Sequence, residues 1–88
     1  MFYFYVLQSL KDGELYFGST RDLRKRIEAH NVGKVFSTRT RKPFRLAYYE
    51  AYSAEHDARM REKQIKLRAQ AFTALKRRIT NCIGKNRF

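Results

Sequence analysis

Two aromatic segments separated by an Asp-Gly pair constrain the fold more than any other feature of this chain. Residues 2–9, FYFYVLQS, are rich in aromatic and β-branched types, and residues 15–19, LYFGS, repeat that character. Between them, Asp12 and Gly13 form a dipeptide that favours a tight hairpin turn. The chain is therefore predicted to begin with an antiparallel β-hairpin.

The register of this hairpin follows from counting back from the turn. With the Asp-Gly pair as the two turn residues, Leu7 would face Gly18 and Tyr5 would face Thr20. Opposed residues share a face of the sheet, and alternate residues repeat it. The common face predicted in this way holds Tyr5, Leu7, Tyr16 and Gly18.

A helix is predicted over residues 21–31, RDLRKRIEAHN. Thr20 is the expected N-cap, and Asp22 falls in the first turn, where a negative charge is favourable. Arg26 lies at the border of the predicted buried face. The members of that face are Leu23, Ile27 and His30.

The rest of the chain completes a small α+β domain. Residues 32–44 have no helical period and predict a basic loop, and residues 44–52 predict a third strand. Ser53 is the expected N-cap of a second helix, which either continues beyond Gln70 or is followed by a second short one. The order ββαβα predicts a three-stranded antiparallel sheet flanked by helices, in one domain over residues 1–88 with a basic helical tail from residue 68.

The second helix carries an acidic residue, Glu62, among apolar ones. Glu62 falls on the stripe formed by Ala58, Ile65, Ala69 and Phe72. A lone carboxylate in such a place is costly to desolvate. It predicts a bound partner, either a divalent cation or an internal ion pair with Arg26.

The charge of the chain favours a polyanionic partner. Twenty Lys and Arg residues oppose eight Asp and Glu, for a net charge of +12, and no acid follows Glu62. Such a field attracts nucleic acid through counterion release, although a ribosome-associated chain or a merely solvated surface fits the same composition. The basic residues predicted to contact phosphates are Lys34, Arg39, Arg41, Lys42 and Arg45.

Cysteine content and hydropathy indicate a cytoplasmic protein. Cys82 is the single cysteine, so no internal disulfide is expected. No apolar run is long enough to span a membrane. The apolar start MFYFYVL lacks a positive leader and is expected to be a strand instead of a signal peptide.

The polar residues placed so far suit phosphodiester cleavage. A carboxylate holds a divalent metal ion against a phosphate oxygen, and an arginine neutralises charge that gathers on the phosphate. A phenol or an imidazole takes a proton from the attacking water. The chain offers two tyrosines on one sheet face, an arginine and a histidine on one helix, and a glutamate on another.

These residues stand in segments that resemble the GIY-YIG nuclease domain, particularly its small stand-alone members. The resemblance covers about residues 2–67. Tyr3 and Phe4 replace the usual first residues of the first motif, and the family's late asparagine has only Asn81 or Asn86 as candidates. The matching segments are YFY (3–5), YFG (16–18), STRDLRKRIEAHN (19–31), STRTRKPFRLAYYEAY (37–52) and DARMREKQIK (57–66).

The resemblance implies a DNA endonuclease that uses one divalent metal ion, Mg²⁺ or Mn²⁺. Glu62 would hold the metal, Arg26 the scissile phosphate, and the two tyrosine hydroxyls would position or activate water with the help of His30. Gly18 would allow a close approach of backbone and phosphate. The implied catalytic residues are Tyr5, Tyr16, Arg26, His30 and Glu62.

Two other functions remain open at this stage. A binding module would keep the scaffold and the basic surface without activity, and an RNA-directed protein would share the same charge. Tyr5 and Tyr16 would then be ordinary strand aromatics. A role in DNA repair or recombination is expected for a nuclease of this type, with a protein partner as a possible source of specificity.

Overall fold

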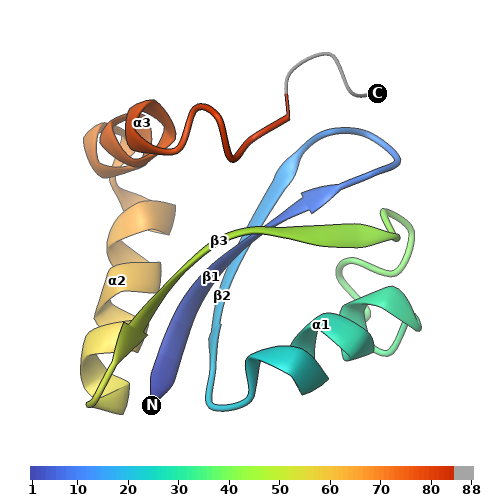
Figure 1. Cartoon of the computed structure of the whole chain (residues 1–88), viewed down its shortest axis with the longest axis horizontal. Coiled ribbons are helices and arrows are strands. Elements are labelled where there is room, and N and C mark those ends of the chain that lie inside the picture. The colour runs from blue at the N-terminus through green and yellow to red at the C-terminus, as the bar shows by residue number, and fades with distance from the viewer. Residues whose placement is uncertain (85–88) are drawn as a thin grey trace.

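A computed structural model describes residues 1–84 of the chain. The predicted α+β class is confirmed, since one antiparallel sheet and three helices form a single unit (Figure 1). The elements in chain order are β1 (Phe2–Ser9), β2 (Leu15–Thr20), α1 (Leu23–Asn31), β3 (Phe44–Tyr52), α2 (Glu55–Leu67) and α3 (Ala69–Arg78).

The sheet has the strand order β2-β1-β3 and separates two helical layers. In Figure 1, α2 and α3 lie on one side of the sheet and α1 lies on the other. Phe4 and Val6 of β1 pack against Ile65 of α2 and face the first layer. Tyr5 and Leu7 face the second layer, where they pack with Leu23, Ile27 and Phe44.

The hairpin confirms the predicted common face but corrects the predicted register by two residues. Tyr5 lies opposite Gly18, and Leu7 lies opposite Tyr16 instead of Gly18. The reason is a longer turn, in which the Ser9 amide donates to the carbonyl oxygen of Glu14 at 2.9 Å. A shift of two residues preserves the facing of every side chain, because the period of a strand is two.

A β-bulge in β3 lets this strand contribute to both layers. Val6 pairs with Tyr48 and the next residue, Leu7, pairs with Leu46, so Ala47 is the extra residue. Leu46 packs in the layer of α1, whereas Ala47 and Tyr48 both pack against the core under α2 and α3.

The first helix begins later than predicted. Asp22 is its N-cap, and the carboxylate of Asp22 accepts a hydrogen bond from the Lys25 amide at 3.0 Å. Thr20 is not the cap, because its hydroxyl oxygen accepts a hydrogen bond from the amide of Asp22, which precedes the first helical residue, Leu23. The predicted buried face is confirmed in His30, with Leu23 and Ile27 packed beside it.

The second helix ends at Leu67, and α3 is a separate helix. Arg68 has extended backbone angles, φ −123° and ψ 110°, which interrupt the helical hydrogen bonding between α2 and α3. The predicted N-cap Ser53 is wrong, since α2 starts after Ala54 without a side-chain cap. Ala58 and Ile65 are buried as predicted, but the break leaves Ala69 exposed.

The segment after α3 is bonded to the far end of the sheet. The side-chain oxygen of Gln8 accepts from the Gly84 amide at 2.9 Å, and Arg45 donates to the carbonyl oxygen of Cys82 at 2.6 Å. Asn81 is exposed, and the other candidate for the late asparagine, Asn86, lies outside the described residues. Among residues 1–84, every helix is too short or too polar to cross a bilayer.

Candidate active site

A buried chain of hydrogen bonds joins β1, α1 and the loop before β3. The hydroxyl of Tyr5 lies 3.1 Å from His30 Nε2, and His30 Nδ1 lies 2.8 Å from the hydroxyl oxygen of Thr38. All three side chains are buried. Ser19, Glu62 and Arg26 are not part of this hydrogen-bond chain. The candidate site therefore combines buried side chains with residues that are partly or fully exposed to solvent.

The direction of the protons in this chain follows from Thr38. Its hydroxyl has one hydrogen, which points to the carbonyl oxygen of Val35 at 3.4 Å, so its oxygen accepts from His30 Nδ1–H. Nε2 is then unprotonated and accepts the hydrogen of the Tyr5 hydroxyl. The arrangement assigns one neutral tautomer to His30.

Burial keeps both groups uncharged. Desolvation, together with a smaller effect of the nearby charge of Arg26, lowers the pKa of His30 from 6.5 to about 4. Desolvation also raises the pKa of the Tyr5 phenol well above its ordinary value, against an opposing effect of Arg26. At neutral pH the phenol is therefore a proton donor and the imidazole a proton acceptor.

Tyr16 is the more accessible of the two phenols. Its ring packs edge-on against His30, with 5.0 Å between the ring centroids, and it is only partly buried. Gly18, on the same face, makes room for Tyr5, since a Cβ there would lie 2.5 Å from the Tyr5 Cζ. The glycine thus serves the packing of a tyrosine, and the phosphate approach expected from the sequence stays a prediction.

Glu62 reaches the edge strand β2 from the opposite layer. One carboxylate oxygen accepts from the Ser19 hydroxyl at 2.7 Å, and the other lies 2.7 Å from Lys66 Nζ. Lys66 also lies over the ring of Tyr16, 5.7 Å from its centroid, and so connects the two sides of the strand. The Glu62 side chain keeps 23% of its surface exposed. The carboxylate is therefore less desolvated than its position on an apolar stripe predicted.

Of the two partners predicted for Glu62, the alternative of an ion pair with Arg26 is wrong within residues 1–84. The carboxylate is engaged by Ser19 and Lys66 instead. Arg26 lines a cavity of about 330 Å³ that also contains Ser19. Because Ser19 touches both this cavity and Glu62, a group bound there would lie between an arginine and a carboxylate. Two further arginines, Arg21 and Arg59, line the same cavity.

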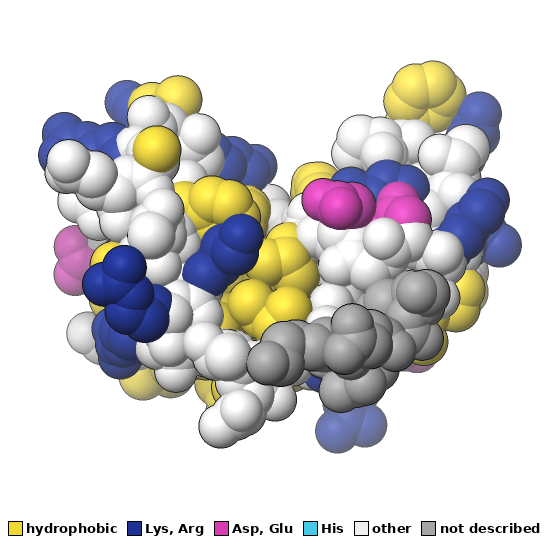
Figure 2. Space-filling view, turned by 90° about the horizontal axis from the view of Figure 1, so that it is seen from above, with side chains coloured by type: hydrophobic (Ala, Val, Ile, Leu, Met, Phe, Trp, Pro, Cys, Tyr) yellow, Lys and Arg dark blue, Asp and Glu magenta, His cyan; other side chains and the backbone are white. Residues whose placement is uncertain are grey.

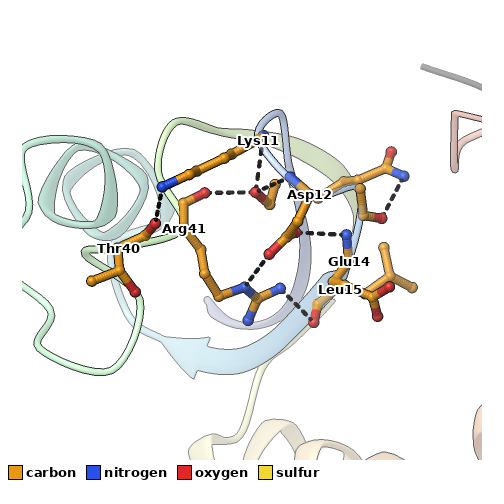
Figure 3. A network of polar contacts seen from close by, with 9 residues as sticks. Lys11, Asp12, Glu14, Leu15, Thr40 and Arg41 are labelled. Carbon is orange, nitrogen blue, oxygen red and sulfur yellow. Dashed lines mark hydrogen bonds and ion pairs between the residues drawn. The ribbon is translucent and has the colours of Figure 1, made fainter. Parts of the chain in front are cut away.

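The basic residues predicted to bind phosphate divide into two groups. Lys34, Arg39 and Lys42 are exposed. Arg41 is held by Asp12 at 3.2 Å and by the carbonyl oxygen of Leu15, as Figure 3 shows. Arg45 is likewise engaged by Gln8 and Cys82. Seen from above, Lys and Arg side chains lie on both sides of the central hollow, while acidic side chains form a small cluster (Figure 2).

The chain as a whole matches a known protein family. The family model of the GIY-YIG catalytic domain matches residues 1–80. The chain belongs to the GIY-YIG family. The family is one of nucleases, which act on nucleic acid.

Relatives of this GIY-YIG domain include small bacterial proteins called UPF0213. The chain is 45% identical over 65 residues to a UPF0213 protein of Bacillus pumilus, covering 73% of this chain and 65% of that protein. It is 42% identical over 71 residues to a UPF0213 protein of Pediococcus pentosaceus, covering 80% and 74%. The chain thus spans about two thirds to three quarters of these relatives. No solved structure matches the chain significantly.

The donor set of the GIY-YIG domain suits a metal ion that keeps most of its waters. Residues 1–84 contain no cluster of three His, Cys, Asp or Glu side chains that would enclose a metal. Mg²⁺ is commonly held by one or two carboxylates together with water and substrate phosphates, which fits Glu62 beside the cavity of Arg26. The ammonium of Lys66 lies where such a cation would meet the carboxylate.

Three residues of this site were not predicted from the sequence. Lys66 had a detectable signal, because it follows Glu62 by four residues on one helix. Ser19 follows Gly18 and points to the opposite face, so only the position of α2 reveals its role. Thr38 lies in a segment without periodicity, and its contact with His30 depends on how the loop folds back.

Proposed function

We propose that this chain is a metal-dependent endonuclease that hydrolyses phosphodiester bonds of DNA. The observation that carries the proposal is the buried Tyr5–His30–Thr38 chain, in which a neutral imidazole holds the hydrogen of a phenol. Such a pair is suited to moving a proton away from attacking water. Support for a nucleic-acid substrate comes from the family and from the net charge of +12.

Each residue has a separate role in this proposal. Water that attacks the phosphorus transfers a proton to a phenol oxygen, and when that phenol is Tyr5 its own proton passes to His30 Nε2. Tyr16, which is more accessible, orients the water, and Arg26 neutralises charge on the scissile phosphate. A divalent metal ion on Glu62 would supply Lewis-acid stabilisation of the phosphate oxygens.

The phosphate-binding surface is proposed to be smaller than the sequence predicted. Lys34, Arg39 and Lys42 are exposed and available to the DNA backbone. Arg41 and Arg45 are engaged in hydrogen bonds within the protein, so we assign them to the fold. We place the protein in the cytoplasm, in line with its free exposed thiol at Cys82. We assign its activity to DNA repair or recombination.

A binding module without catalytic activity is the second candidate, and Lys66 is the observation that favours it. An ammonium 2.7 Å from the Glu62 carboxylate already supplies a positive charge to the residue that would hold the metal ion. In an inactive protein this ion pair would be permanent. In an active enzyme the cation and the substrate phosphate would displace Lys66.

Cleavage assays decide between these candidates. Purified protein is incubated with duplex, nicked and branched DNA and with RNA, with and without Mg²⁺ or Mn²⁺. We expect metal-dependent cleavage of DNA by the wild type and its loss in Glu62→Gln, while DNA binding persists in both. Binding without cleavage of any substrate in either metal would support the binding module, and cleavage of RNA alone would refute the assignment to DNA.

A further inference from the structure

An aromatic side chain projects from the basic loop between α1 and β3. Phe36 is 78% exposed, the largest exposed fraction of any large hydrophobic residue within residues 1–84. The guanidinium carbon of Arg39 lies 4.6 Å from the centroid of its ring. We call Phe36 and Arg39 the stacking pair.

The loop that carries the stacking pair is bonded to the body of the protein directly after Phe36. Thr38 is buried and bonded to His30. Ser9 donates to the carbonyl oxygen of Arg41 at 2.6 Å, and Lys11 donates to that of Thr40 at 3.0 Å (Figure 3). Phe36 is thus exposed on a loop that is fixed to the body of the protein by the side chain of Thr38 and by the backbone of Thr40 and Arg41.

The surroundings of Phe36 select one kind of partner. Single exposed apolar side chains are common and by themselves indicate nothing. Here the neighbours are cationic, since Lys34, Arg39 and Lys42 are exposed and no acid occurs between Glu28 and Glu50. An aromatic ring with a stacked guanidinium amid basic side chains matches an unpaired nucleobase, whose flat face stacks while its phosphates meet the cations.

The stacking pair is also close to the catalytic residues. Thr38, two residues beyond Phe36, bonds directly to His30. Two steps along the chain span at most about 7.6 Å between Cα atoms. A base stacked on Phe36 would therefore lie near the end of α1 that carries His30.

We infer that Phe36 stacks on an unpaired base, so that the substrate is DNA with a single-stranded segment beside a duplex. This inference rests on the proposed function and specifies its substrate class. A blunt duplex keeps its bases paired and offers Phe36 only a backbone. Discrimination between the two forms of DNA would come from this one aromatic contact, while the cations bind both.

The test compares three substitutions of Phe36 by equilibrium binding without divalent metal. The probes are a blunt duplex and the same duplex with a single-stranded overhang that contains 2-aminopurine at the unpaired positions. Phe36→Ala should weaken binding of the overhang DNA by roughly five- to a hundred-fold and leave the blunt duplex within about twofold. Phe36→Tyr should retain the wild-type preference and the quenching of 2-aminopurine, whereas Phe36→Leu should lose both.

Two results would overturn the inference. Equal weakening on both DNAs would show that Phe36 supports the fold or a general contact, and wild-type binding by Phe36→Leu would show a non-aromatic contact. The binding assay contains no metal and measures no cleavage. A wild-type protein that fails to cleave DNA therefore refutes the proposed nuclease without affecting the result for Phe36.

Discussion

His30 connects stability to pH because it is buried, uncharged and bonded through both ring nitrogens. Its pKa in the folded protein is about 4, below the 6.5 of an exposed histidine. The unfolded chain therefore binds a proton between these two pH values while the folded protein does not. The contribution to stability is complete above pH 6.5 and is lost as the pH falls towards 4.

A first prediction concerns this pH window. The free energy of unfolding should fall between pH 6.5 and 4 by about 3 kcal/mol from His30, beyond the effect of the carboxylates. His30→Gln should be less stable at neutral pH and show a weaker dependence over this window, as measured by urea unfolding. His56, which is exposed, provides the control, since His56→Gln should keep the wild-type dependence. An unchanged pH dependence in His30→Gln would contradict the depressed pKa.

A second prediction concerns Thr38 as the residue that positions His30. Thr38→Val keeps the shape but leaves the Nδ1–H of His30 without an acceptor, which should cost about 1–3 kcal/mol. Thr38→Ser should restore most of the loss. NMR of the imidazole distinguishes positioning from packing, because the valine variant should lose the protected Nδ1–H signal. A destabilised valine variant that keeps this signal would assign Thr38 to packing alone.

At the scale of single elements, α2 brings the metal-binding candidate and its competitor together. Glu62 and Lys66 are one turn apart, and their ion pair on a partly exposed surface contributes little to stability, typically about 0.3–0.5 kcal/mol. The position of Lys66 over Tyr16 is more informative, since the same ammonium contacts Glu62 on α2 and Tyr16 on β2. Thus α2 itself supplies the ammonium of Lys66 that neutralises the carboxylate of Glu62.

A third prediction follows for Lys66→Gln. Without the competing ammonium, Glu62 should bind Mn²⁺ more tightly, and the metal concentration at half-maximal binding should fall by several-fold in calorimetric titration. The midpoint of thermal unfolding should change little. Lys76→Gln on α3 is the control, because the ammonium of Lys76 lies over the ring of Phe72 and not at Glu62. Equal metal affinity in Lys66→Gln and the wild type would show that Lys66 does not compete.

The proposed phosphate contacts of the loop before β3 give a fourth prediction. Replacing Lys34 and Lys42 by Gln should reduce the slope of log affinity for DNA against log salt by about 1.8, since each phosphate contact contributes about 0.9. Arg41→Gln should leave the slope unchanged, because Arg41 is bonded to Asp12 and Leu15. A reduced slope in Arg41→Gln would return this arginine to the DNA surface.

At the scale of the whole molecule, the sequence predicted what depends on local periodicity. The buried face of α1 and the positions of Tyr5 and Tyr16 on one face of the sheet follow from periods of 3.6 and two residues. The register was wrong by two because the turn closes through Ser9, which no local pattern indicates. The partners of Glu62 and His30 depend on which segments meet in space, so Ser19 and Thr38 escaped detection.

The extra residue in β3 also bears on how the length of this chain can vary. Without Ala47, Leu46 would still pair with Leu7 and Tyr48 with Val6, so a regular ladder would keep every remaining side chain on its present face. A one-residue deletion should therefore be tolerated here at the expense of local bending, whereas deletion of Leu7 in central β1 would put part of that strand out of phase with both neighbours. Circular dichroism of the two deletion variants should show a native fold for the first and its loss for the second. Chains of this kind that differ by one residue in the third strand would then share one architecture, and the difference would be a change of curvature instead of a change of fold.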